Sequence, residues 1–123
     1  MITGYSNSGI SGDKSESSYG AEDYWILKLN PTGDIIWQKS VGGTGTDYSF
    51  RVLLLPDGNL VAVGYSASEI SGLKSAINKG VNDYWMICLN NDGVVLWDKS
   101  YGSSLADYFN SAIIVDDGIL LGG

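Results

Sequence analysis

The sequence predicts an all-β protein made of two tandem copies of one 60-residue unit. When each residue is laid over the one 60 positions later, the register never slips. The matching segments include Gly4-Tyr5-Ser6 with Gly64-Tyr65-Ser66, Asp23-Tyr24-Trp25 with Asp83-Tyr84-Trp85, and Trp37 with Trp97. No apolar run keeps the 3.6-residue period over the roughly ten positions that a helix needs. We therefore expect one repeat over residues 1–60, a second over 61–120, and the start of a third at 121–123.

Four short runs rich in Val, Ile, Leu, Tyr and Trp supply the strands of each unit. The expected strands are residues 23–29, 34–40, 49–55 and 59–66, with 83–89 and 94–100 repeating the first two. Hairpin turns are expected at 30–33, 56–58, 90–93 and 116–118. Glycine adopts a positive φ in such turns, and Asn or Asp bonds to its own backbone.

The two faces of each strand indicate how the sheets are covered. Strand 23–29 is apolar on both alternating sets of side chains, so both of its faces need a cover. Strand 34–40 instead carries Asp34, Gln38 and Lys39, which suit a partly solvated edge. A four-stranded antiparallel sheet covered on both faces and repeated every 60 residues is typical of a β-propeller blade. From the inner to the outer edge, the expected strand order is 49–55, 59–66, 83–89 and 94–100.

Several motifs resemble a known bacterial repeat. The run Gly42-Gly43-Thr44-Gly45-Thr46-Asp47-Tyr48, followed by Asp57-Gly58-Asn59-Leu60-Val61-Ala62-Val63-Gly64-Tyr65-Ser66, resembles the seven-bladed β-propeller repeat, or SBBP repeat. The spacing of Gly33 and Gly93, four residues before Trp37 and Trp97, is similar to the tryptophan-docking repeat of quinone-type propellers. The resemblance implies a partial propeller from a secreted or surface-attached bacterial protein, usually without an assigned activity. The second copy departs from the motif at 102–106, where glycines are lost.

Composition excludes several classes of partner. The formal net charge of -7 leaves no basic stripe to neutralise phosphates, so we expect no nucleic-acid partner. No segment approaches the roughly 20 apolar residues of a membrane span. Cys88 is the only cysteine, so we expect no intrachain disulfide and read this thiol as a small apolar filler. Expected neighbours are further blades of the same larger protein, with a head-to-tail homo-oligomer as the alternative.

Catalysis is not expected. The chain has no histidine and no Gly-x-Ser-x-Gly elbow, and we predict no cofactor and no metal. The segment before Asp47 resembles one calcium-binding nonapeptide, but tandem copies are missing, so Asp47 and Asp107 are expected to cap the turns that precede the inner strands. A paired-carboxylate hydrolase stays open, and its candidate residues are Glu22, Asp23, Asp47 and Asp107. The alternative function is therefore a scaffold of a carbohydrate-active hydrolase or lyase, or a sugar-binding, lectin-like propeller.

The four tryptophans also allow two interpretations. Trp25, Trp37, Trp85 and Trp97 each lie mid-strand at a repeated position, which favours packing between blades. Stacking of sugars on their rings is the alternative.

Two long loops form the predicted binding rim. Residues 7–22 and 67–82 both keep the pattern Ile-Ser-Gly-x-Lys-Ser, which suggests an ordered loop anchored by Ile10 or Ile70. Strand alternation places both loops on the same rim as turn 42–47. Because loops on a rigid scaffold often carry binding groups, protein or carbohydrate is the expected ligand, and structural padding is the alternative. The candidate binding residues are Ser11, Lys14, Asp47, Ser71, Lys74 and Asp107.

Overall fold

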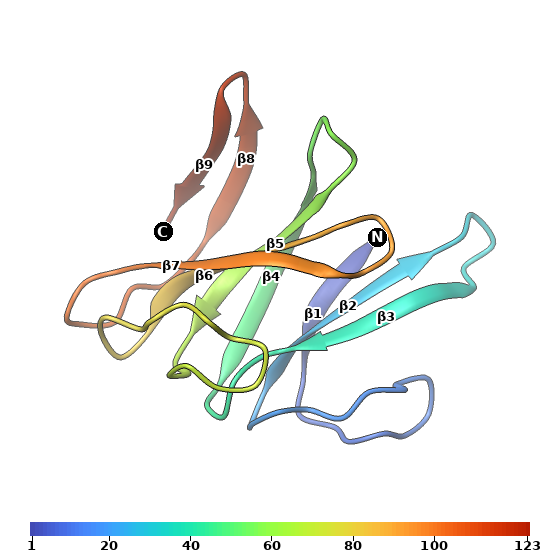
Figure 1. Ribbon diagram of the computed structural model, residues 1–123, viewed down its shortest axis with the longest axis horizontal. Coiled ribbons are helices and arrows are strands. Elements are labelled where there is room, and N and C mark those ends of the chain that lie inside the picture. The colour runs from blue at the N-terminus through green and yellow to red at the C-terminus, as the bar shows by residue number, and fades with distance from the viewer.

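A computed structural model describes residues 1–123, and all of its regular elements are β-strands. The strands are β1 (Ile2–Ser6), β2 (Asp23–Leu29), β3 (Ile35–Val41), β4 (Asp47–Leu54), β5 (Leu60–Ser66), β6 (Asp83–Leu89), β7 (Val95–Tyr101), β8 (Ser111–Val115) and β9 (Gly118–Gly122). They form three antiparallel sheets in the orders β1-β2-β3, β4-β5-β6-β7 and β8-β9 (Figure 1). The all-β prediction is confirmed. Because the chain forms no helix, it has none long and apolar enough to cross a membrane.

The middle sheet contains the predicted strands in the predicted order. Each strand bound lies within two residues of its expected position, and every neighbouring pair is antiparallel. This sheet runs from residue 47 to residue 101, so it takes strands from both 60-residue units. The sheets are therefore offset from the sequence repeats. The middle sheet is completed by strands β6 and β7 of the second unit.

Two apolar clusters hold the three sheets together. The cluster between the first and middle sheets contains Tyr24, Ile26, Val41, Ala62, Trp85, Ile87 and Leu89. The cluster between the middle and last sheets contains Leu53, Val61, Val63, Met86, Cys88, Phe109 and Ala112. Alternate residues of β5 and β6 enter the two clusters, because successive side chains of a strand point to opposite faces. Both faces of the central strands β5 and β6 are dry, as the apolar pattern predicts.

The outer strands are less covered. β3 and β7 are the edge strands of their sheets, and most of their residues are exposed or half-buried. This confirms the expected solvated edge. Cys88 is buried in the second cluster, where loss of solvent raises the pKa of its thiol. The thiol therefore packs as a small apolar group, as predicted.

The β-hairpin turns follow the predicted chemistry with one difference. Gly33, Gly58 and Gly93 have φ of 90°, 87° and 82°. The side-chain oxygen of Asn30 accepts the backbone N–H groups two and four residues later, which fixes the first of these turns. The last hairpin is tighter, because Val115 pairs directly with Gly118 and this glycine has no positive φ.

Candidate functional site

The two long loops contain the same small turn. Ser11 and Lys14 exchange two backbone hydrogen bonds, and Ser71 and Lys74 do the same in the second loop. The glycine between each pair has φ of 55°, a left-handed conformation that favours glycine. The retained Ile-Ser-Gly-x-Lys-Ser pattern therefore encodes an ordered turn, as the sequence suggests.

The predicted isoleucine anchor is wrong. Ile10 and Ile70 are 68% and 58% exposed, whereas Lys14 and Lys74 are only 4% and 2% exposed. Each lysine ammonium has three donors, which satisfy loop acceptors that an isoleucine would leave without partners. Lys14 donates to the carbonyls of Ser8 and Glu16. The lysine side chains thus hold the loops together from inside.

Lys74 is buried close to several carboxylates. Its Nζ donates to the carbonyl of Ala76 at 2.6 Å and lies 5.8 Å from the centre of the Trp85 ring. Burial lowers the pKa of Lys74, while Asp47 and other nearby carboxylates oppose that change. The ammonium therefore compensates buried negative charge at the centre of the loop rim.

Asp47 and Asp107 cap their turns as predicted. Oδ2 of Asp47 accepts the N–H of Gly43 at 2.9 Å, and Oδ2 of Asp107 accepts the N–H of Ser103 at 2.6 Å. Asp47 also accepts hydrogen bonds from the hydroxyls of Ser66 and Ser68. Each carboxylate fixes the chain as it enters an inner strand.

The structure brings together carboxylates that the sequence leaves unpaired. Asp23 and Asp47 both point at the backbone of Gly42, where a β-carbon would clash with Oδ1 of Asp23 and lie 2.9 Å from Oδ2 of Asp47. Asp83 and Asp107 meet at Gly102 in the same way. The remaining candidate, Glu22, instead accepts the hydroxyl of Thr46. Two like pairs therefore recur 60 residues apart.

These carboxylates are enclosed. Asp23 and Asp47 are fully buried, and Oδ1 of Asp23 has no hydrogen-bond partner. Burial raises the pKa of Asp23, with a further rise from the charge of Asp47, and burial also raises the pKa of Asp47. No group of three His, Cys, Asp or Glu residues is placed to hold a metal ion. The Asp23–Asp47 pair is therefore shielded from solvent, whereas Asp107 of the second pair is half-buried.

The six candidate binding residues do not form one site. Asp47, Ser71 and Lys74 belong to one assembly, where loop 67–82 lies on turn 42–47 and the Ser71 hydroxyl accepts the N–H of Thr44 at 2.8 Å. Ser11 and Lys14 belong to the first loop, and Asp107 to the later turn. Among the six, Ser11 is exposed and Ser71 and Asp107 are half-buried. The other three, Lys14, Asp47 and Lys74, are buried.

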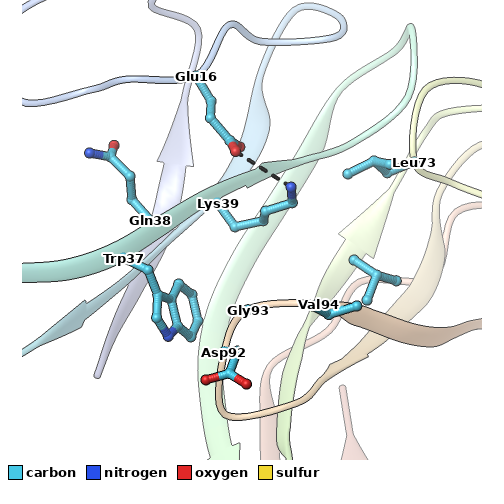
Figure 2. Close-up of a pocket in the computed structure, with 9 residues that line it drawn as sticks. Glu16, Trp37, Gln38, Lys39, Leu73, Asp92, Gly93 and Val94 are labelled. Carbon is cyan, nitrogen blue, oxygen red and sulfur yellow. Dashed lines mark hydrogen bonds and ion pairs between the residues drawn. The ribbon is translucent and has the colours of Figure 1, made fainter.

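A pocket of about 430 Å³ lies between the first and middle sheets (Figure 2). Trp37 forms one wall, where its ring contacts the backbone of Gly93 and its Nε1 donates to the carbonyl of Asn91 at 2.9 Å. The ion pair between Lys39 and Glu16 spans 3.4 Å at the opposite side. The indole is thus engaged in contact between sheets, as the packing interpretation of the tryptophans expects.

The other three tryptophans differ in how deeply they are buried. Trp85 is fully buried, with its ring centre 4.8 Å from that of Tyr24. Trp25, its counterpart 60 residues earlier, is half-buried and donates to Gln38. Trp97 is partly exposed on the outer strand β7. Packing is therefore observed for Trp37 and Trp85.

Sequence reasoning missed an exposed group of aromatic rings, which we call the tyrosine surface. It consists of Tyr5, Tyr48, Phe50, Tyr65 and Tyr108. Its centre is the pair Tyr48 and Tyr65 with ring centres 5.2 Å apart, and Tyr5 and Tyr108 extend it to both sides. The repeated Gly-Tyr-Ser and Asp-Tyr motifs were the available signal, because they place a tyrosine at the rim end of the inner strand and of the strand paired with it.

Comparison with known proteins gives no name to the fold. No family model matches the chain, and no curated protein matches it.

Proposed function

We propose that this chain is a non-catalytic scaffold of β-propeller type, belonging to a larger secreted or surface bacterial protein, whose loop rim binds protein or carbohydrate. The observation that carries this proposal is the middle sheet, whose central strands β5 and β6 are dry on both faces because a neighbouring sheet lies against each. A unit that buries its faces only against its neighbours is the basis of stacked repeat architectures.

Contacts that recur between successive sheets support the same proposal. Tyr5 packs edge-on against Tyr48 across the first interface, and Tyr65 packs edge-on against Tyr108 across the second. The ring centres are 4.4 Å and 5.2 Å apart, and the interplanar angles are 85° and 89°. The same residue positions therefore join each sheet to the next, so a further repeat would use the same contact.

The buried charges favour a structural role over catalysis. Asp47 accepts hydrogen bonds from three groups of the surrounding loops, and Lys74 donates to loop acceptors. Groups that are enclosed and already bonded have no free position for a reacting atom. The paired carboxylates thus serve to fix the turns in the proposed scaffold.

A fused protein tests the stacking proposal directly. Joining residue 120 of one copy to residue 1 of a second would place residues 118–120 and 1–6 in the register that β5 occupies. We expect the fused protein to unfold in one transition at a temperature at least ~5 °C above that of the single chain, because more sheet faces become covered. Calorimetry of both proteins measures the difference.

The matched control carries one extra glycine at the junction. A one-residue insertion turns every following side chain of a strand to the opposite face, so the gain should disappear. An equal unfolding temperature for the fused protein and the single chain would contradict the stacking proposal. Equal gains with and without the inserted glycine would contradict it as well.

A further inference from the structure

We propose that the tyrosine surface is a binding site for neutral polysaccharide, with Phe50 at its centre. This inference goes beyond the scaffold proposal, because it names a site and the class of its ligand. It also differs from the predicted rim residues, three of which are buried.

Three rings of the tyrosine surface are half exposed or more. Tyr5, Phe50 and Tyr108 are 52%, 50% and 57% exposed. Phe50 lies on β4, the edge strand of the middle sheet, next to the half-buried Tyr48 and Tyr65. Contiguous apolar area of this kind is typical of interaction sites.

A local irregularity in β4 directs Phe50 outward. The pairing of β4 with β5 passes from Ser49 opposite Gly64 to Arg51 opposite Val63, which leaves Phe50 as the extra residue of a bulge. Bulges re-aim side chains and are frequent next to functional sites. The equivalent position in the second unit is Asn110, so packing of the repeat does not require an aromatic ring there.

Two of the rings beside Phe50 are tilted only moderately from it. The Phe50 ring lies within 28° of the Tyr48 ring and within 32° of the Tyr65 ring, at centre distances of 6.5 Å and 5.6 Å. Aromatic faces attract the C–H bonds of a sugar ring, and phenol hydroxyls at the ring edges both donate to and accept from sugar hydroxyls. Partial desolvation raises the pKa of Tyr48 and of Tyr65, which keeps both phenols protonated as donors.

The shape of this surface favours sugar rings over a peptide. None of the four pockets of the chain is lined by a residue of the tyrosine surface. Protein partners usually insert an anchoring side chain into a pocket, whereas a pyranose ring lies flat on an aromatic platform. A group of exposed rings without a pocket therefore suits a polysaccharide, whose sugar rings can each lie against a single aromatic face.

The net negative charge of the protein favours an uncharged polysaccharide. The protein has 14 acidic and 7 basic residues, which repels polyanionic glycans at low ionic strength. The border of the surface carries an acidic group, since the half-buried Glu22 lies near Tyr48. Its carboxylate oxygens offer further hydrogen bonds to sugar hydroxyls.

Affinity electrophoresis of the folded chain in native gels tests the proposal. The probes are hydroxyethylcellulose, glucomannan and laminarin as neutral polysaccharides, with carboxymethylcellulose as the anionic comparator. We expect at least one neutral polysaccharide to retard the protein and the anionic one to retard it less. Phe50→Asn, which copies the residue of the second unit, should weaken binding about fivefold. Tyr108→Ala should act in the same direction.

Tyr101→Ala is the matched control, because Tyr101 is also an exposed tyrosine but lies on the outer strand β7. Its binding should stay within about twofold of the unaltered chain. Circular dichroism and the unfolding temperature of each variant establish that it is folded. The inference is overturned if no neutral polysaccharide retards the folded chain, if Phe50→Asn binds as the unaltered chain does, or if a displayed peptide library binds this surface while glycans do not. The stacking proposal is tested by the unfolding temperature of the fused protein, and the binding proposal by retardation in polysaccharide gels. Failure of one proposal can therefore be told apart from failure of the other.

Discussion

Turns 42–46 and 102–106 occupy equivalent positions in the two units but differ in their surroundings. Both are held by the end of the preceding long loop, where the backbone N–H of Asp47 donates to the carbonyl of Glu22 and the backbone N–H of Asp107 to that of Asn82. Only the first turn has a second set of partners. Loop 67–82 lies over it, and the N–H of Leu73 donates to the carbonyl of Gly42 at 2.9 Å. Turn 42–46 is therefore clamped on two sides and turn 102–106 on one.

The covering loop accounts for the glycines of the first turn. A β-carbon at Gly43 would clash with Ser68, and one at Gly45 would lie 3.0 Å from the carbonyl oxygen of Ala67. Both contacts come from the covering loop. The equivalent positions hold Ser103 and Leu105, which are exposed. The need for glycine in turn 42–46 is thus set by loop 67–82 of the neighbouring sheet.

Gly42→Ala should have the largest effect of the substitutions considered. The added methyl group meets two buried carboxylates beneath a clamped turn, so we expect a loss of about 3 kcal/mol in the free energy of unfolding. Gly102→Ala should cost about 1 kcal/mol, because its exposed turn is free to shift. Denaturant unfolding of both variants measures the two losses.

Gly4→Ala serves as the control, since nothing lies within 4 Å of its β-carbon position. It should change the free energy of unfolding by less than about 0.5 kcal/mol. Equal losses for the variants at Gly42 and Gly102 would contradict the role given to the covering loop.

Trp37 and Trp97 extend the comparison to the outer strands. Trp37 contacts Gly93 of the neighbouring sheet and donates to Asn91, while Trp97 is partly exposed. Trp37→Ala should cost about 2 kcal/mol, below the value for a fully buried tryptophan, and Trp97→Ala about 1 kcal/mol or less. Thermal unfolding of the two variants ranks them. A larger loss at Trp97 would show that the contact between sheets is not what stabilises this position.

Lys74 and Lys14 provide a third matched pair. Lys74→Met removes the bonds to Ala76 and Asn78 and the cation above Trp85, and it leaves Asp47 without its nearby positive charge. We expect a loss of about 2 kcal/mol, against about 1 kcal/mol for Lys14→Met. Urea unfolding gives both values.

The exposed loop residue Ile70 provides the internal reference for the lysines. Ile70→Ser should change stability by less than about 0.5 kcal/mol. If this substitution cost more than Lys74→Met, the isoleucine would be the anchor after all.

Strand positions and order were predictable because they depend on short-range patterns. Alternating apolar residues and turns such as that at Asn30 determine where a strand begins and which faces need a cover. Both patterns survive in each unit, so the order of the middle sheet followed directly. The arrangement of whole sheets into a ring is not tested by these patterns, and it stays a proposal.

The interior of the loop rim was not predictable from sequence. Burial of Ile70 was expected because isoleucine is apolar, but the loop interior contains backbone carbonyls, which need a donor such as Lys74. The approach of Asp23 to Asp47 depends on the pairing of β2 with β3, which sequence spacing does not reveal. The exposure of Phe50 follows from a bulge, and no local pattern marked it.

The buried carboxylates give the smallest expected effect, a dependence of stability on pH. Because the folded-state pKa values of Asp23 and Asp47 are raised above 3.8, the folded chain binds protons more readily than the unfolded chain in that range. Their contribution to stability therefore increases as the pH falls from neutral toward 3.8. Asp98 has the opposite effect below pH 3.8. Burial raises its pKa, but the hydrogen bonds from Ser75, Trp85 and Ala76 outweigh burial, so its folded-state pKa is lowered. The stability that Asp98 contributes is therefore lost as acid protonates it. The stability maximum should thus lie between pH 3.8 and neutrality.

Asp23→Asn should flatten this profile. The amide keeps an acceptor for the N–H of Tyr19 and places a donor where the carboxylate oxygen had no partner. We expect it to stabilise the chain at pH 7 by about 1 kcal/mol or less, with no gain near pH 4. Asp13→Asn, at an exposed loop position, should leave the profile unchanged. Urea unfolding from pH 4 to 8 measures all three proteins, and a steeper acid-side rise in the Asp23 variant would show that this carboxyl group is not the one that binds the proton.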